Sequence, residues 1–535
     1  MLAPASMAAR HCPNPECPFF KKFNAPAEYR EGFESCSDCG SALADGPVPT
    51  LASAVAVAVA DPAMVAPAEA VTGSGEFLRP AAVSLVALIL AALCDQVLLP
   101  GIDPSILSLL AEGGARPDNA SMMMSVFSLG LNPFLSAFVL VEFVALLIPS
   151  WRRLRTGGPT GRARLRTATV VLAVVFAFVQ AWGMGRFYAD FGSGPAFEGQ
   201  PFFSGEGALP IPVIILLLAG AVLLLHGLTV VVDKRGLGNG YAVVLLGMSL
   251  APAFRLLAQA VEYMSLGVVD SLSGLLGLLG LVGLGWATVK ILRGQLPGMS
   301  RGTEQPSWLP LPASGLAPIS FAGALLSLPA TLGTLLGVSE LASLSRALES
   351  SLWVYSLVFF VLLTLSSAAF SVLFYSPQRV GAVWAALTAK DAAERPVVHG
   401  RAALRTRELL PVAAAWSVVL GTMAWLPASL AGPLLALPLP SMVALVTGVA
   451  IAMDLVEEAR KRREATWVPV WPVHRSYEVE PAIVALSAAG IPAWARGVHA
   501  RTLLQFFGPY FSIDLMVPPE RTAEARTLLE KAQQA

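Results

Sequence analysis

Charged residues are scarce in this chain of 535 residues: they make up 13% of it, whereas a soluble domain typically carries about 25%. This shortage excludes an ordinary soluble enzyme, and the high apolar content excludes disorder over most of the length. Lysine plus arginine and aspartate plus glutamate are equal at 36 each, so no basic surface for nucleic acid is indicated. Histidine occurs only five times, without a metal-binding pair, and the apolar segments contain no nucleophile–base pattern. A polytopic enzyme such as a protease or lipid transferase is therefore disfavoured, and we expect no enzymatic activity.

Long apolar segments dominate what is present, since 55% of the residues are hydrophobic. A helix needs about 20 mainly apolar residues to cross a bilayer. Ten segments meet this requirement, at roughly 80–99, 122–148, 167–186, 210–232, 240–262, 268–292, 315–338, 352–376, 409–431 and 437–457. We therefore predict an all-α polytopic membrane domain of ten transmembrane helices over residues 78–464.

Basic residues alternate between the connections. They are concentrated after the second, fourth, sixth, eighth and tenth apolar segments, whereas the intervening connections hold few. Because Lys and Arg accumulate on the cytoplasmic side, this pattern predicts a multi-pass protein with both termini in the cytoplasm. Asp95 and Asp454, near the ends of the first and last segments, are interpreted as reaching interfacial water.

A cysteine cluster precedes the first apolar segment, in two pairs: Cys12, Cys17, Cys36 and Cys39. Two pairs on tight turns can present four thiolates tetrahedrally to Zn²⁺. A cytoplasmic location also disfavours disulfides. We predict a structural zinc ribbon over residues 1–41, followed by an Ala/Val/Pro-rich linker over 42–77. The alternative is four unrelated cysteines in a polar segment.

The composition becomes that of a soluble domain again in residues 465–535. Strands are predicted at 467–475 and 512–518 and from Gly490 onward, with helices at Glu480–Ala489 and Arg521–Ala532. This order predicts a small cytoplasmic α+β domain of ferredoxin-like type. It resembles a short bacterial domain associated with signal transduction; the alternative is a compact tail domain without an assigned role.

Several sequence blocks go beyond what hydrophobicity requires. In chain order they are Leu99–Pro104 (LPGIDP), Ser125–Ala137 (SVFSLGLNPFLSA), Asp233–Gly240 (DKRGLGNG), Trp308–Pro312 (WLPLP), Gly315–Ala322 (GLAPISFA), Leu328–Thr331 (LPAT) and Phe374–Pro377 (FYSP). In order and spacing these blocks resemble the SecY family of protein-translocation channels over residues 80–460. Gly130, Pro133 and Pro318 are interpreted as breaks inside apolar helices, and the glycines of DKRGLGNG as a tight turn with positive φ.

The resemblance implies a fold and a function. The fold is a clamshell of two pseudo-symmetric five-helix halves around an hourglass pore. The function is a protein-conducting channel for translocation or membrane insertion of polypeptides in the bacterial plasma (inner) membrane. Implied partners are a SecE-like small membrane subunit, SecA or a ribosome, and an unfolded polypeptide as substrate, with nucleic acid met only through a ribosome.

The resemblance also assigns residues to sites. The pore ring falls on Leu131, Leu135, Leu245, Ser249, Ser320 and Thr447. The lateral gate falls on Ser136, Glu142, Gln180 and Ser314. Cytoplasmic docking falls on Lys234, Arg235, Arg293, Arg301 and Arg395. Without the resemblance, the aliphatic residues of the ring would be interpreted as ordinary helix packing. Glu142 is expected to face the interior, the alternative being a protonated residue beside lipid.

Three departures from the family pattern favour an alternative. Half of the ring carries hydroxyls, which would let a dewetting seal leak. The plug segment, Ser105–Met124, is short, and the sixth-to-seventh connection is reduced with few basic residues. The alternative is a divergent, non-conducting SecY homologue that acts as a membrane scaffold or sensor through its cytoplasmic zinc-ribbon and C-terminal domains.

Overall fold

The computed structural model has two compact units, Met1–Ala66 and Pro67–Ala535. It describes residues 10–12, 17–18, 28–29, 35–37, 39, 44–45, 74–102, 124–148, 150–151, 154, 158–190, 209–293, 312–336, 338–349, 351–389, 391–430, 441–505 and 511–534. The first unit, called the amino-terminal module below, contains three short strands, β1 (Arg10–His11), β2 (Glu28–Tyr29) and β3 (Ala44–Asp45). Both β2 and β3 pair antiparallel with β1, which lies at the centre of this small sheet.

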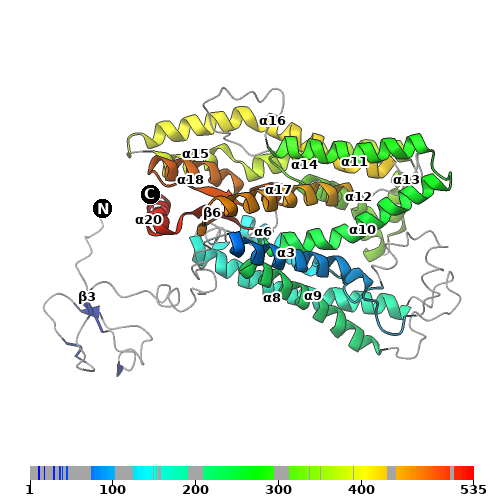
Figure 1. Ribbon diagram of the computed structural model, residues 1–535, viewed down its shortest axis with the longest axis horizontal. Coiled ribbons are helices and arrows are strands. Elements are labelled where there is room, and N and C mark those ends of the chain that lie inside the picture. The colour runs from blue at the N-terminus through cyan, green and yellow to red at the C-terminus, as the bar shows by residue number, and fades with distance from the viewer. Residues whose placement is uncertain are drawn as a thin grey trace. The chain divides into compact units, whose positions relative to one another are not determined.

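The helices of the second unit fall into two packed groups. The first helix group comprises α3 (Ser74–Leu93) with the short η2 (Cys94–Gln96), α6 (Asn132–Leu147), α8 (Gly158–Asp190), α9 (Ile211–Arg235) and α10 (Gly240–Ser265). In this group α6 packs on α8, α8 on α9, and α3 on both α9 and α10. Figure 1 shows these blue-to-green helices side by side.

The second helix group follows in the chain. It comprises α11 (Ser271–Leu292), α12 (Ala317–Leu336), α13 (Ser339–Glu349), α14 (Leu352–Phe374), α15 (Pro377–Thr388), α16 (Arg395–Leu430) and α17 (Met442–Glu464). Here α14 packs between α12 and α16, and α17 packs on both α11 and α16. The two groups meet mainly where α10 and α3 contact α17 and where α10 contacts α11.

Seven described helical segments are long and apolar enough to cross a membrane, by length and composition. They are Phe77–Gln96, Ala163–Ala189, Ile211–Arg235, Gly240–Ser265, Ser271–Leu292, Leu352–Thr388 and Arg395–Trp425. Two shorter apolar helices, Asn132–Val141 and Ala317–Ala330, add to them. Large apolar side chains are also exposed on these helices, as at Leu224 in α9 and Val282 in α11. A multi-pass membrane protein is the class that fits this surface, while the count of ten spans stays a prediction.

The interpretation of two prolines as breaks inside helices was wrong. Residues 124–131 form turns rather than helix, Gly130 has φ +53° there, and Pro133 lies in the first turn of α6. Pro318 likewise lies in the first turn of α12. Proline is favoured at helix starts because its missing N–H would have no partner there. The second apolar segment therefore becomes helical only at Asn132.

The C-terminal domain, residues 467–534, is a three-stranded sheet with helices. Its elements are β4 (Val468–Val473), η5 (Ser476–Glu478), α18 (Val479–Ala488), β5 (Trp494–Arg496), α19 (Val498–Leu503), β6 (Ile513–Val517), η7 (Pro519–Arg521) and α20 (Thr522–Gln534). The central β6 pairs antiparallel with β4 and β5, which gives the strand order β4-β6-β5. The predicted order of strands and helices is present. The strand predicted from Gly490 onward is β5, which begins at Trp494, and α19 was not predicted.

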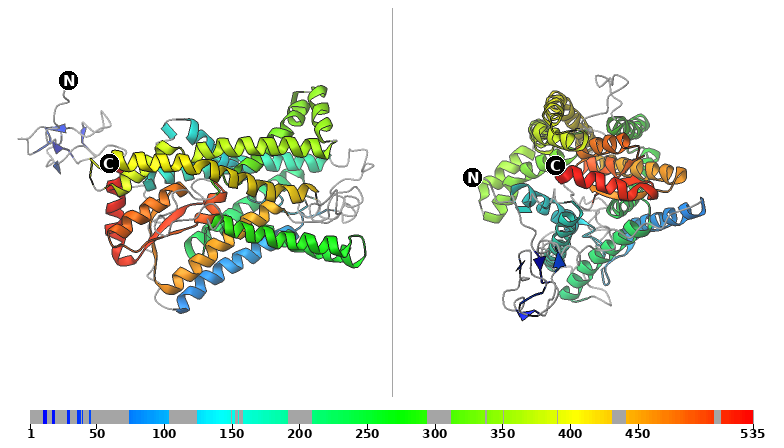
Figure 2. Two further views of the ribbon diagram at one scale, coloured as in Figure 1. Left: turned by 90° about the horizontal axis from the view of Figure 1, so that it is seen from above. Right: turned by 90° about the vertical axis from the view of Figure 1, so that its left-hand side faces the viewer.

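Two separate cores receive the apolar side chains of this domain. Val470, Leu486 and Leu515 belong to a core between the sheet and helices α18 and α20. Tyr477, Leu503 and other residues instead belong to the large core that is shared by the helices of the two groups. These helices are called the membrane-type helices. One face of the domain is therefore buried against these helices, and Figure 2 shows its red elements at one end of them.

Close packing of α3 on α10 depends on Gly247. A Cβ there would lie 2.5 Å from the Leu88 carbonyl oxygen and 2.7 Å from the Ala91 Cβ. We expect Gly247→Ala to lower the free energy of unfolding by about 1–3 kcal/mol, because two backbones must separate. Gly280→Ala on α11 is the matched control, since nothing lies within 4 Å of its Cβ. Chemical denaturation in detergent measures both, and equal stability of the two variants would contradict this packing.

Candidate functional site

The four cysteines of the amino-terminal module come together as a cluster. The Sγ atoms of Cys12 and Cys39 are 3.5 Å apart, those of Cys17 and Cys36 are 3.7 Å apart, and all four lie within 4.8 Å of one another. Four thiolates at about 2.3 Å from a tetrahedral Zn²⁺ would be separated by about 3.8 Å. The donor set and its spacing therefore fit a metal ion with four sulfur ligands.

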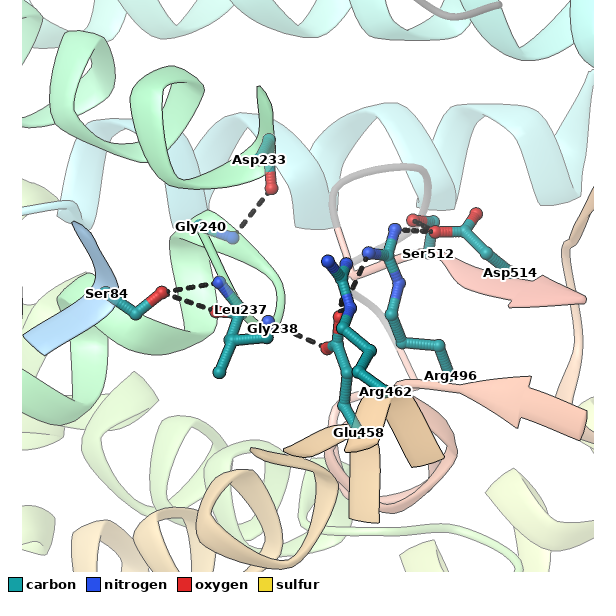
Figure 3. A network of polar contacts seen from close by, with 10 residues as sticks. All are labelled: Ser84, Asp233, Leu237, Gly238, Gly240, Glu458, Arg462, Arg496, Ser512 and Asp514. Carbon is teal, nitrogen blue, oxygen red and sulfur yellow. Dashed lines mark hydrogen bonds and ion pairs between the residues drawn. The ribbon is translucent and has the colours of Figure 1, made fainter. Parts of the chain in front are cut away.

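The turn between α9 and α10 is held by side chains from three helices (Figure 3). Ser84 of α3 donates to the Leu237 carbonyl oxygen at 2.8 Å and accepts from the Leu237 N–H at 2.7 Å. Asp233 accepts from the Gly240 N–H at 2.7 Å. Of the three turn glycines only Gly238 has the predicted positive φ, at +80°, whereas Gly236 is extended at φ −101° and Gly240 begins α10. The Gly238 N–H donates to Glu458 of α17 at 2.8 Å. Glu458 therefore links the second helix group to the first.

Glu458 is also the centre of a charge network that reaches the C-terminal domain (Figure 3). Its fully buried carboxylate lies 2.7 Å from an Arg462 nitrogen and 3.5 Å from an Arg496 nitrogen. Arg496, at the end of β5, also lies 2.6 Å from Asp514 of β6. Burial alone would lower the pKa of Arg496, but the carboxylates of Glu458 and Asp514, with a weaker effect of Asp233, hold it above its usual value. The Arg496 guanidinium stays charged and joins a carboxylate of helix α17 to a carboxylate of the C-terminal domain.

Helix α19 has both ends satisfied by membrane-type helices. Its cap residue is Gly497, which offers no side-chain acceptor. The Asp454 carboxylate of α17 accepts from the N–H groups of His499 and Ala500 instead, at 3.0 and 2.8 Å. At the other end, the Leu503 carbonyl accepts from the Leu316 N–H at 2.9 Å, just before α12 begins. Helix ends leave such groups without intrahelical partners, so α19 is completed by α17 and α12.

A buried polar cluster joins the end of α14 to the same domain. The Tyr375 hydroxyl lies 2.5 Å from the Ser476 hydroxyl and accepts from the Gln505 side-chain amide at 3.0 Å. Arg501 is 1% exposed, and its guanidinium donates to the carbonyls of Leu504, Gln505 and His474. Buried polar groups need such partners, and this interface supplies them.

His499 of α19 pairs with Glu457 of α17, and we expect this contact to make the attachment of α19 dependent on pH. Burial alone would lower the pKa of His499, but the hydrogen bond to Glu457, 3.3 Å away, and the charge of Asp454 outweigh burial and the opposing Arg293, and raise it above 6.5. A raised pKa contributes stability that is complete below the ordinary pKa and is lost as pH rises through the folded value.

We therefore expect the thermal unfolding midpoint of the full chain in nanodiscs to fall as pH rises from about 6 to 8. His499→Gln should flatten this dependence, because glutamine does not titrate. An equal fall in the variant and the wild type would assign the pH dependence to other groups.

The residues assigned to the pore ring lie on four helices or, for Leu131, directly before one. Leu131 is buried in the main core, while Leu135 in the first turn of α6 and Leu245 in α10 are half-buried and pack against this core. The Ser249 hydroxyl of α10 donates to the Leu245 carbonyl, and the Thr447 hydroxyl of α17 to that of Val443. Ser320 of α12 is exposed. Whether these residues form a ring stays a prediction.

The residues assigned to the lateral gate are partly brought together. The Gln180 amide of α8 donates to the Ser136 hydroxyl of α6 at 3.4 Å. Ser314 is instead buried beside α16, where its N–H donates to the Ser417 hydroxyl at 3.1 Å. Glu142 belongs to α6, but its side chain lies outside the described residues.

The residues assigned to docking lie at helix ends. Lys234 and Arg235 are exposed at the end of α9, and Arg293 is exposed directly after α11. Arg395 is half-buried at the start of α16, and Arg301 lies outside the described residues.

Sequence reasoning missed the polar contacts that attach the C-terminal domain. Asp454 was expected to reach interfacial water, which is wrong, because it accepts two backbone hydrogen bonds from α19. Asp95, given the same interpretation, forms an ion pair with Arg255 of α10. Glu458 and Arg496 lie 38 positions apart, and no local pattern connects them.

The helices and their exposed apolar surface define the class as a multi-pass membrane protein. The family model for SecY matches residues 125–456, which is more than half of the chain. The chain belongs to the SecY family, as the resemblance implied.

Known relatives agree with this placement. The protein translocase subunit SecY of Pseudomonas aeruginosa is 27% identical over 281 residues, which cover 48% of this chain and 60% of that protein. The subunit of the same name from Haemophilus influenzae is 25% identical over 334 residues, covering 57% and 74%. The matched part of this chain thus spans about three fifths of the first of these relatives. A solved structure described as that of a protein conducting channel aligns with a TM-score of 0.44 and 14% identity, covering 74% of this chain and 94% of that chain.

Proposed function

We propose that this protein is a protein-conducting channel that passes unfolded polypeptides across, or laterally into, the bacterial plasma membrane. The observation that carries this proposal is the match of the SecY family model over residues 125–456. The relatives are named protein translocase subunits. The membrane-type helices would then form the channel. Its partners would be a SecE-like small subunit and either SecA or a ribosome.

The two helix groups are proposed to be the two halves of the channel. Ten spans, with both termini in the cytoplasm, would place the pore between α6 and α10 on one side and α12 and α17 on the other. The groups meet mainly through α10 and α3 against α17, and a meeting confined to so few helices supports halves that can part.

Hydroxyls in the proposed ring are compatible with a seal. In an open pore a free hydroxyl would attract water. The hydroxyls of Ser249 and Thr447 are already donated to carbonyls one turn back in their own helices, as Ser and Thr often do in apolar helices. At Ser249 and Thr447 the hydroxyls are therefore a weaker argument for a non-conducting protein than the sequence alone indicated, while Ser320 is exposed.

The amino-terminal module is proposed to hold a structural zinc ion through Cys12, Cys17, Cys36 and Cys39. Four sulfur ligands leave no open coordination position, so the ion would stabilise the module and take no part in a reaction. The separations between the sulfur atoms support this proposal.

A photo-crosslinking experiment tests the channel. A photoreactive amino acid at Leu135 is expected to crosslink to a secretory polypeptide arrested during translocation, because the chain would pass the half-buried first turn of α6. The same probe at Val282, which is 71% exposed on α11, is the control and should crosslink to lipid. Equal crosslinking at both positions, or none at Leu135 with a functional partner present, would favour the non-conducting scaffold.

A further inference from the structure

We propose that the C-terminal domain is a clamp that holds the two helix groups together at one end and must detach before they part. The consequence for transport rests on the proposed channel function, but the clamp itself does not. Three observations support the clamp: the domain contacts helices of both groups, hydrogen bonds and ion pairs hold these contacts, and apolar side chains of the domain are buried in the core of the helices.

The domain attaches firmly to the second helix group. Asp454 of α17 and the Leu316 N–H complete the two ends of α19. The Leu503 carbonyl also leaves no room for a side chain at Gly315, where a Cβ would lie 2.3 Å from this oxygen and φ is +58°. Backbone of the domain therefore lies directly against the start of α12.

Further contacts attach the domain to the end of α14 and to α15. Tyr375 hydrogen-bonds with Ser476 and Gln505, and the Arg475 guanidinium lies 5.4 Å from the centre of the Phe374 ring. Helices α18 and α20 pack on α15. The start of α12 and the end of α14 are thereby both attached to the C-terminal domain, through α19, η5 and Gln505.

The domain also reaches the first helix group. Strand β4 contacts α8. Arg496 pairs with Glu458, whose other carboxylate oxygen accepts from the Gly238 N–H in the turn between α9 and α10. Arg496 also attracts Asp233 at the end of α9. A single guanidinium thus stabilises the contact between the groups (Figure 3).

Burial indicates that this attachment is part of the resting fold. Leu503 is 1% and Phe511 2% exposed, and both lie in the core that also contains Phe134 of α6 and Tyr241 of α10. Detachment would expose these side chains and leave the Asp454 carboxylate and the ends of α19 to water. The two groups can therefore part only after the domain has released its contacts with at least one of them.

Two variants and two readouts on the full chain in nanodiscs test the clamp. Asp454→Asn replaces one acceptor for α19 by a donor, and Arg496→Gln removes the charge beside Glu458. Hydrogen exchange of the Val498–Leu503 amides reports attachment. The separation of the two groups is measured by electron paramagnetic resonance between labels on non-natural amino acids. The labels replace two exposed residues, Lys234 at the end of α9 and Arg379 in α15.

We expect exchange about tenfold faster in both variants than in the wild type, with a longer and broader distance distribution. Glu520→Gln, exposed in η7, is the matched control and should change neither readout. Arg496→Lys keeps the charge and should restore the wild-type distances, which excludes general misfolding. Unchanged exchange in both variants, or faster exchange with unchanged distances, would overturn the clamp.

Polypeptide transport separates this inference from the proposed function. If the distances respond as expected but the wild type passes no polypeptide with its partners present, the channel proposal fails and the clamp stands. If the wild type transports and the distances do not respond, the clamp fails and the channel proposal stands.

Discussion

Replacing Cys36 by serine is expected to abolish metal binding by the amino-terminal module and to unfold it. The module is small: its described strands, β1, β2 and β3, have two residues each. Such short strands bury little apolar surface, so the proposed four-sulfur metal site is expected to supply much of the stability. Structural Zn²⁺ contributes about 10–16 kcal/mol of apparent binding free energy in zinc-finger peptides, and loss of one buried thiolate forfeits most of it.

Metal analysis of the purified full chain measures this effect, together with proteolysis of residues 1–66. The wild type should contain about one zinc per chain, and the variant almost none, with rapid cleavage of the module. Cys94→Ser is the matched control, because Cys94 lies in η2 and outside the cluster. Full zinc content in Cys36→Ser would contradict a four-cysteine site.

Glu458→Ala is expected to lower the free energy of unfolding by about 3–5 kcal/mol, because breaking a buried ion pair leaves charge without compensation. The Glu458 carboxylate is fully buried and contacts Arg462, Arg496 and the Gly238 N–H. Its removal leaves the Gly238 N–H buried without its acceptor and weakens the position of Arg496. Both the turn between α9 and α10 and the C-terminal domain should loosen.

Denaturation of the full chain in detergent measures this loss. Glu464→Ala on the same helix is the matched control: Glu464 pairs with Arg460 and Lys461 near the surface, and exposed pairs contribute about 0–1 kcal/mol. Comparable stability of the two variants would show that the Glu458 network does not hold the fold together.

Much of the fold could be predicted because a membrane simplifies the sequence signal. Each bilayer-spanning helix needs a long apolar run, and α9, α11 and α14 begin within about three residues of the predicted segments. The glycine turn was also predictable, since Gly238 requires the positive φ that glycine adopts freely.

The prolines show where this signal ends. A proline in an apolar window can lie inside a helix or in its first turn, and hydropathy is the same in both cases. Pro133 and Pro318 lie in first turns. Leu98 pairs antiparallel with Ser125, a residue that precedes α6. A hydropathy window covers only neighbouring residues, so it cannot reveal such a contact between distant segments.

The attachment of the C-terminal domain was beyond sequence reasoning for a similar reason. Helix α19 is six residues long and has glycine at its start, so it lacks a capping signal of its own. Its caps come from Asp454 and Leu316, which are 45 or more residues away in the chain. Only the folded chain shows that a carboxylate near the end of an apolar segment accepts from another helix rather than from water.

The most direct measurement of the central claim is transport itself. The purified protein is reconstituted into vesicles with a SecE-like subunit and a motor, and a secretory polypeptide is added outside. We predict that the polypeptide becomes resistant to external protease and is digested once detergent opens the vesicles. Complete digestion without detergent, while a known SecY translocase protects the same polypeptide in parallel, would contradict the channel.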